Sequence, residues 1–308
     1  MRGARAPRIV PRTLPYADLD GCRIWYELKG SGDYLLQIPG MFFAHHNFGL
    51  VSDAMAEHFT VIDFDQRGTG LSDRPSQRYS IELWADDCAL LLHALGVEHA
   101  HVHGTSAAGM VAIHFAAAYP EKVDRLVIDC SAAKLDFVGR AGCEVWKALA
   151  RAYGLGSREL ALNIASQACS RSFLDGERGA ETVESIRELV ERNCTLETFC
   201  AVCDAMIAAD LSADLGRVRA PTLVTVGNQD VMTPLDQGPQ GVGNRAIAER
   251  IPDAELYVME GVGHANLLEA PELTTRVVLE FLAPRRERTL ERRSIGRRSV
   301  REKDDLDG

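Results

Sequence analysis

Short apolar runs of strand length alternate with longer amphipathic segments along the first 131 residues. The short runs predict strands, and the longer segments, whose apolar residues recur at helical spacing, predict helices. Strands are expected over 16–19, 22–27, 34–38, 60–64, 100–103 and 123–128, and helices over 81–95 and 107–119. Because strands that alternate with helices build βαβ units, we expect an α/β fold with a mostly parallel central sheet flanked by helices.

The pattern changes after the sixth predicted strand. Between 132 and 210 the sequence has no strand-like run, and helices are expected over 144–153, 181–193 and 197–209. Strands resume over 221–226 and 255–259, before a last helix over 271–282. We therefore expect a core made of residues 16–131 and 211–284, with residues 132–210 inserted as a helical lid.

The two ends of the chain fall outside this pattern. Residues 1–15 are basic and are expected to form an N-terminal arm. Residues 285–308 are rich in arginine and acidic residues and have few large apolar side chains. A segment with so little apolar surface to bury is predicted to be a disordered charged tail. An arginine-mediated contact with a partner or an anionic surface is the alternative interpretation.

Composition narrows the classes of function. The 308 residues carry a net charge of −10, which argues against general nucleic-acid binding. No apolar run approaches the roughly 20 residues that span a bilayer, and the basic N-terminus has no apolar h-region of a secretory signal. The sequence predicts a cytoplasmic protein that acts on a small molecule and binds neither membranes nor nucleic acids.

The eight cysteines are scattered through the chain, unlike the dense framework of a small disulfide-bonded domain. Cys200 and Cys203 form a CxxC pair, but no second such pair completes a zinc site. Buried free thiols are therefore expected.

The segment HGTSAAG, residues 103–109, has the form of a nucleophile elbow. Ser106 follows an apolar run, precedes a predicted helix and is flanked two positions away by the small residues Gly104 and Ala108. Bulk at those two positions would obstruct the sharp turn from strand to helix. A serine in such a turn is also a common helix N-cap, so its interpretation depends on its partners.

Asp230 and His264 are the partners that a nucleophilic serine requires. Both follow predicted strands, and the carboxyl ends of parallel strands meet at one edge of the sheet. We predict that Ser106 is the nucleophile, that His264 is its general base and that Asp230 orients His264. Asp236 as the acid, with Asp230 capping a turn, is the alternative.

A developing oxyanion needs preorganised N–H donors. The Ala107 amide, at the start of the helix after the elbow, is one expected donor. The second is expected from the turn after the strand over 34–38, at Met41 or alternatively at Phe42. Phe42 and the lid residue Trp146 are the predicted substrate-binding side chains. Three lid arginines are further candidates for substrate contact: Arg140, Arg151 and Arg171.

Four motifs resemble those of the α/β-hydrolase superfamily: the turn at Pro39-Gly40, DFDQRGTGLSDRP, HGTSAAG, and GNQDVMTP paired with GVGHANLLEAPE. The resemblance covers residues 16–282 and implies an α/β-hydrolase fold. Within the superfamily, GTSAAGMVAIHFAAAYPEKVDRLVIDCSAAKLD and CTLETFCAVCDAMIAADLSADL resemble 3-oxoadipate enol-lactonases, with aminoacrylate hydrolases and small carboxylesterases also similar. Serine at 106 excludes the relatives that use an aspartate nucleophile. Pro39 departs from the His-Gly that such hydrolases often carry, and the residues that follow Gly40 make the pocket entrance more apolar.

Other motifs have alternative interpretations. His99, His101 and His103 alternate along one strand, as metal ligands can, but no partner ligands stand at other strand ends with the needed spacing. The glycines at 68–70 and 261–263 lack the context of a dinucleotide site. Neither a metal nor a cofactor is predicted.

The residues after the strand over 60–64 are expected to have a supporting role. Asp65, Arg67 and Ser72 are predicted to brace a loop near the site. His45 and His46 are predicted to begin a helix, with a place in the pocket wall as the alternative.

These features predict a cofactor-free serine hydrolase that cleaves a small ester or lactone through an acyl-enzyme. Hydrolysis of a C–C bond in a vinylogous diketone would use the same serine and histidine. A non-hydrolytic ligand-binding or cyclase member of the same fold is the alternative from a different class.

Overall fold

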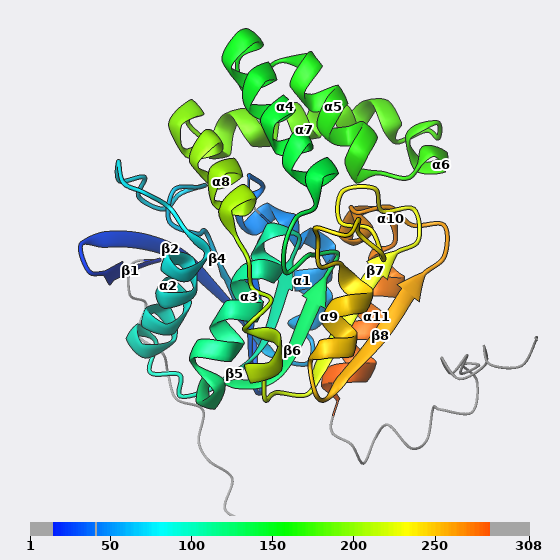
Figure 1. Ribbon diagram of the computed structural model, residues 1–308. Helices are drawn as coiled ribbons and strands as arrows, with labels where there is room; N and C mark the ends of the chain where they lie inside the picture. Colours follow the sequence, from blue (N-terminus) through cyan, green and yellow to red (C-terminus); the bar gives the residue numbers. More distant parts are fainter. Residues whose placement is uncertain (1–14, 41, 284–308) are drawn as a thin grey trace, which may run out of the picture.

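The computed structural model describes residues 15–40 and 42–283. Its strands are β1 (Tyr16–Leu19), β2 (Cys22–Gly30), β3 (Tyr34–Ile38), β4 (Thr60–Phe64), β5 (Ala100–Thr105), β6 (Val123–Asp129), β7 (Thr222–Gly227) and β8 (Ala254–Met259). They form one eight-stranded sheet in the order β1-β2-β4-β3-β5-β6-β7-β8 (Figure 1). The β1–β2 and β2–β4 pairs are antiparallel and all other neighbours are parallel, which confirms the predicted mostly parallel sheet.

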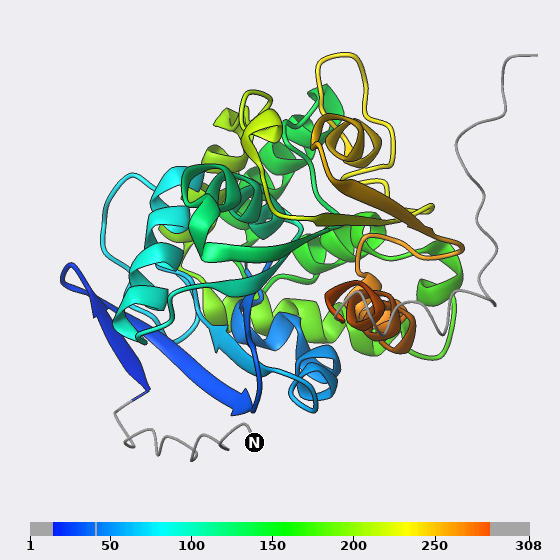
Figure 2. The same cartoon turned by 90° about the horizontal axis from the view of Figure 1, so that it is seen from below.

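Helices cover both faces of this sheet. The core helices are α1 (Gly49–Met55), α2 (Ile81–Ala94), α3 (Ala107–Ala118), α9 (Asn244–Arg250), α10 (Asn266–Glu269) and α11 (Pro271–Leu282). Figure 2 shows α2, α3 and α9 on one face and α1 with α11 on the other. Each layer has its own apolar core, because parallel strands present side chains to both faces and both must be covered.

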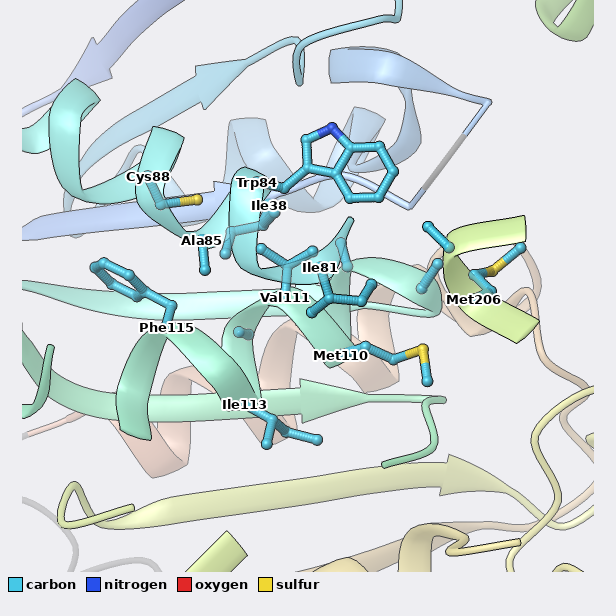
Figure 3. Packing of buried hydrophobic residues seen from close by; sticks show 14 of the residues in the cluster. Ile38, Ile81, Trp84, Ala85, Cys88, Met110, Val111, Ile113, Phe115 and Met206 are labelled. Atoms are coloured by element: carbon cyan, nitrogen blue, oxygen red, sulfur yellow. The ribbon is translucent and has the colours of Figure 1, made fainter. Parts of the chain in front are cut away.

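The larger core packs around α3, the helix that follows the elbow. Its sequence AAGMVAIHFAAA is apolar on nearly all sides, so the helix is buried between the sheet and α2. Val111 and Phe115 of α3 lie beside Trp84 and Cys88 of α2 (Figure 3). This packing leaves α3 little freedom to move, and it fixes the position of the serine at its N-terminus.

Five α-helices come between β6 and β7: α4 (Phe137–Tyr153), α5 (Arg158–Ala168), α6 (Arg171–Leu174), α7 (Gly179–Asn193) and α8 (Leu196–Ala208). They gather above the end of the sheet where the parallel strands finish (Figure 1). The helix expected over 144–153 begins earlier, at Phe137, because the Asp136 carboxylate caps it by accepting the Gly139 amide at 2.9 Å. Helices α5 and α6 were not predicted individually, and each begins at a serine cap, Ser157 and Ser170.

The terminal segments predicted as an arm (1–15) and a charged tail (285–308) lie outside the described residues, apart from position 15. Within the described ranges, no helix combines the length and the apolar content needed to cross a bilayer.

Candidate active site

Ser106 stands in a strained turn between β5 and α3. Its backbone has φ 57° and ψ −129°, in the left-handed half of φ space that a residue with a side chain rarely adopts. A Cβ at Gly104 would lie 2.5 Å from the Ala108 carbonyl oxygen and 2.6 Å from the Ala112 methyl group, so only glycine fits there. The tight turn therefore explains the small residue two positions before the serine.

The Ser106 side chain does not cap α3, because its hydroxyl makes no hydrogen bond to the helix amides. Its Oγ instead lies 2.8 Å from His264 Nε2. The other ring nitrogen, Nδ1, lies 2.9 Å from Asp230 Oδ2. The three side chains that the sequence singled out, which follow β5, β7 and β8, thus form one hydrogen-bonded row.

Asp230 is held by the turn that follows it. Its carboxylate accepts the amides of Met232 at 2.8 Å and Thr233 at 2.9 Å, together with the Thr233 hydroxyl at 2.9 Å. The Thr233 hydroxyl also lies 3.0 Å from His264 Nδ1. These bonds fix the carboxylate beside the imidazole in a buried site.

The opposite charges of His264 and Asp230 shift the pKa of each residue. Burial lowers the pKa of His264, but the charge and hydrogen bond of Asp230, together with the charges of two further carboxylates, leave the pKa above its ordinary value. Burial raises the pKa of Asp230, yet the charge and hydrogen bond of His264 and the Thr233 bonds bring it below its ordinary value. The arrangement favours a carboxylate beside an imidazole that can gain a proton at Nε2, the atom that faces Ser106.

Asp236, the alternative acid, is exposed and bonds to Arg245 at 2.7 and 3.1 Å. Its carboxylate is committed to a surface ion pair, so the interpretation of Asp236 as the partner of His264 is wrong.

Asp129, at the end of β6, is a site residue that the sequence reasoning missed. It is fully buried, and its Oδ1 accepts hydrogen bonds from Asn266 Nδ2 at 2.7 Å and from the Thr225 hydroxyl. Its main-chain oxygen accepts the Ser106 amide at 2.8 Å, and its charge helps raise the pKa of His264. The available signal was its place as an acidic residue at the end of the strand next to β5.

The turn after β3 lies against the serine. A Cβ on Gly40 would be 3.5 Å from the Ser106 Cβ. Hydrogen bonds hold the turn at both ends. Gln66 Nε2 donates to the main-chain oxygen of Pro39 at 2.8 Å, and Asn193 Nδ2 donates to the main-chain oxygen of Phe42 at 3.1 Å. Met41, the expected second oxyanion donor, lies outside the described residues.

Ala107 begins α3, where a helix leaves its first amides without an intrahelical partner. It also lines a cavity of about 270 Å³ that opens above Ser106. The predicted donor is therefore beside the space where a reacting carbonyl group would lie.

Phe42 and Trp146 both line this cavity. The Phe42 ring stacks on Phe199 with centroids 4.2 Å apart and forms a T-shaped pair with Trp146 at a centroid distance of 6.2 Å. Phe42 has φ 81°, so aromatic contacts with α4 and α8 hold a strained residue of the turn.

The arginines proposed from the sequence are not in the cavity wall. Arg140 bonds to the Leu135 oxygen and to Gln240 Oε1, both at 2.7 Å, and Arg151 and Arg171 are exposed. Arg178, which precedes α7, lines the cavity instead. Its place could not be anticipated, because it depends on how α6 and α7 pack.

The strand histidines do not gather as ligands. His99 is exposed and bonds to Asp124 at 2.7 Å. His101 packs on Phe59 and His103 on Phe48, with ring centroids at 5.6 and 4.9 Å. Across residues 15–40 and 42–283, no group of three or more His, Cys, Asp or Glu side chains is placed to hold a metal ion.

The loop after β4 is braced by its own polar residues. The Asp65 carboxylate accepts hydrogen bonds from His45 Nδ1 and from the Leu71 amide, each at 2.7 Å. The Ser72 hydroxyl donates to the main-chain oxygen of Asp65 at 2.6 Å. Arg67 is buried against Asp87, with bonds of 2.6 and 2.8 Å. These contacts fit the supporting role expected of this loop.

His46 lies in the short helix Ala44–Asn47 and also lines the cavity. Both interpretations of this residue therefore hold at once.

Comparison with known proteins gives a consistent result. The family model of the α/β hydrolase fold matches residues 34–271. A putative carbamate hydrolase RutD from Azorhizobium caulinodans is 29% identical over 273 residues, which are 87% of this chain and 98% of the relative. 3-Oxoadipate enol-lactonase 2 from Acinetobacter baylyi is 29% identical over 225 residues, 72% of this chain and 78% of that protein.

A solved structure of a meta-cleavage product hydrolase from Pseudomonas fluorescens IP01 aligns with a TM-score of 0.74 and 25% identity, over 86% of this chain and 96% of that one. The predicted resemblance to hydrolases, enol-lactonases among them, is thereby confirmed. Since the family model spans most of the sequence and the relatives are hydrolases, this chain belongs to the α/β-hydrolase fold family.

Proposed function

We propose that this protein is a serine hydrolase that cleaves a small carboxylic ester or lactone through an acyl-enzyme. The observation that carries the proposal is the hydrogen-bonded row from Ser106 through His264 to Asp230. A serine hydroxyl attacks poorly until a base removes its proton, and this row supplies the base and the group that orients it.

The reaction has two halves. Ser106 Oγ attacks the carbonyl carbon while its proton passes to His264 Nε2, and the resulting imidazolium is stabilised by Asp230. Collapse of the tetrahedral intermediate breaks the ester C–O bond, and the alkoxide leaves with the proton from His264. A water molecule then attacks the acyl-serine and gives a proton to His264. Collapse of this second intermediate breaks the bond between the acyl carbon and Ser106 Oγ, which takes that proton from His264 as the carboxylic acid leaves.

The amides of Ala107 and Met41 are the proposed donors to the tetrahedral oxyanion. Phe42 and Trp146 are the proposed contacts for the substrate, since both line the cavity above Ser106. Residues 132–210, which include α4 to α8, are proposed to act as a lid over a core made of 16–131 and 211–284.

The cytoplasmic location stays a prediction, supported by eight cysteines that are all free and buried.

The test is replacement of Ser106 by alanine. Turnover of a panel of esters and lactones is expected to fall by about three orders of magnitude or more, because no nucleophile remains. A fluorophosphonate probe should label the wild-type protein at Ser106 and leave Ser106→Ala unlabelled. Unchanged turnover in the variant would refute the proposal, and failure to label folded wild-type protein would favour a non-hydrolytic member of the fold.

Hydrolysis of a C–C bond in a vinylogous diketone is the second candidate. It is favoured by the structural likeness to the meta-cleavage product hydrolase and would employ the same serine and histidine. The same panel, extended with such diketones, separates the two by comparing kcat/KM.

A further inference from the structure

We infer that the cavity above Ser106 takes an uncharged ester or lactone with an apolar chain, and that Gly142 on α4 determines how long that chain can be. This inference rests on the proposed hydrolase function and names its class of substrate. It separates this protein from hydrolases whose substrate keeps a free carboxylate.

The walls of the cavity are mainly apolar. Much of their surface comes from α3, α5, α7 and α8 and from the loop before α4: Met110, Ile164, Ile186, Leu189, Met206 and Leu135. At the entrance, Val138 and Val231 are 68% and 59% exposed and also line the cavity. The volume of about 270 Å³ is slightly below the range of roughly 300–1,000 Å³ that is typical of ligand clefts, so the ligand is small.

The described part of the cavity wall offers no buried lysine or arginine to a negatively charged ligand. Among the described residues in its wall, Arg178 is the only lysine or arginine, and it is exposed. Its guanidinium lies over the Phe173 ring at 5.2 Å and donates to the Leu268 oxygen at 3.4 Å. Glu181, the only acidic residue that the described chain contributes to the wall, is also exposed. The charged side chains of the described wall, Arg178 and Glu181, therefore lie where the cavity meets solvent.

The two histidines of the wall do not supply that cation. His264 is committed to Asp230 and Ser106. Partial burial and the neighbouring His45 lower the pKa of His46, so its imidazole is neutral at neutral pH. An ionised carboxylate on the substrate would lose its water in this cavity and gain no counter-charge, which is strongly unfavourable. A lactone derived from a dicarboxylic acid, such as 3-oxoadipate enol-lactone, carries such a group.

Because Gly142 has no side chain, the cavity extends into the space between α4 and α5. Glycine inside a helix is less favourable than alanine, so its presence there is not explained by the helix itself. It lines the cavity, and a Cβ at this position would lie 3.2 Å from Gln167 Oε1 on α5. A larger side chain at 142 would fill the gap between the two helices and shorten the space for the substrate chain.

The charge preference is tested with a matched pair of esters, methyl hexanoate and monomethyl adipate, which differ mainly in a terminal carboxylate. The wild-type protein should hydrolyse methyl hexanoate with a kcat/KM about 100-fold higher or more. Equal or faster hydrolysis of monomethyl adipate, abolished in Ser106→Ala, would overturn the inference and leave the proposed function intact. Absence of Ser106-dependent hydrolysis of both esters, together with no fluorophosphonate label, would overturn the proposed function and this inference with it.

The role of Gly142 is tested by Gly142→Leu, with Gly142→Ala as a milder change. Hydrolysis of methyl hexanoate should fall about tenfold in kcat/KM, while that of methyl acetate should stay within about twofold. Ala148→Leu, on the exposed side of the same helix, is the matched control and should change neither. An equal loss on both esters in a Gly142 variant that keeps its melting temperature would refute the role in chain length.

Discussion

Asn266, two residues beyond His264 in the chain, donates a hydrogen bond from its side-chain amide to the buried carboxylate of Asp129 at 2.7 Å. The main-chain oxygen of Asp129 meanwhile accepts the amide of Ser106 at 2.8 Å. Asp129 thus joins the strained turn of the serine to the loop of the histidine. Asp129 itself is not among the described residues that line the cavity above Ser106, so it is expected to position the reacting groups rather than to react.

Replacement of Asp129 by asparagine keeps its shape and removes its charge. Since that charge helps raise the pKa of His264, the acidic limb of the kcat/KM–pH profile should move to lower pH. We expect kcat to fall about tenfold, because the Asn266 bond is weakened. Asp236→Asn, at an exposed carboxylate, should leave the profile unchanged, and an unmoved limb in Asp129→Asn would contradict this role.

The wild-type pH profile follows from the His264–Asp230 pair. His264 must be neutral to act as base, and its pKa is raised, so kcat/KM should rise with pH through a midpoint above the ordinary histidine value of about 6.5. In Asp230→Asn the largest of the effects that raise the pKa of His264 is gone, so the midpoint should move to lower pH than in the wild-type protein. The rate should also drop by about three to four orders of magnitude. If the acidic limb of the wild-type kcat/KM–pH profile has its midpoint below pH 6.5, the pKa of His264 is lowered and the prediction is wrong.

Gly104→Ala tests the packing of the elbow. The new methyl group would overlap the Ala108 oxygen and the Ala112 side chain, and overpacking of this kind costs about 1–3 kcal/mol of the free energy of unfolding. Gly216→Ala is the matched control, because a Cβ there meets nothing within 4 Å. Denaturant unfolding should show a loss only in the first variant, and equal stability of both would argue against the steric account.

Asn193→Ala tests how α7 controls the turn beside the serine. The variant loses the bond from Asn193 Nδ2 to the Phe42 oxygen, and the turn that carries Met41 would be less well held. If that turn donates to the oxyanion, kcat should fall about tenfold or more with a smaller change in KM. A circular dichroism melt checks that the fold is kept. A change confined to KM would place the role of Asn193 in substrate binding instead.

The sequence alone determined the parts of this protein that depend on local pattern. Apolar periodicity predicted the strands of the core, and β3 and β4 have the expected bounds. Parallel strands end at one edge, and for this reason the positions of Ser106, Asp230 and His264 after predicted strands were enough to expect their association.

Only the tertiary structure decided what depends on contacts between distant segments. Asn193 and Phe42 are separated by 151 positions, and no local pattern pairs them. Arg140 has the residue type expected at a substrate carboxylate, yet the packing of α4 directs it to Gln240. The mainly apolar wall of the cavity, in which Arg178 is the only lysine or arginine among the described residues, likewise arises where α4, α5 and α7 meet above the sheet. Burial and partners are properties of the packed chain, because they depend on which surfaces the folded helices bring together.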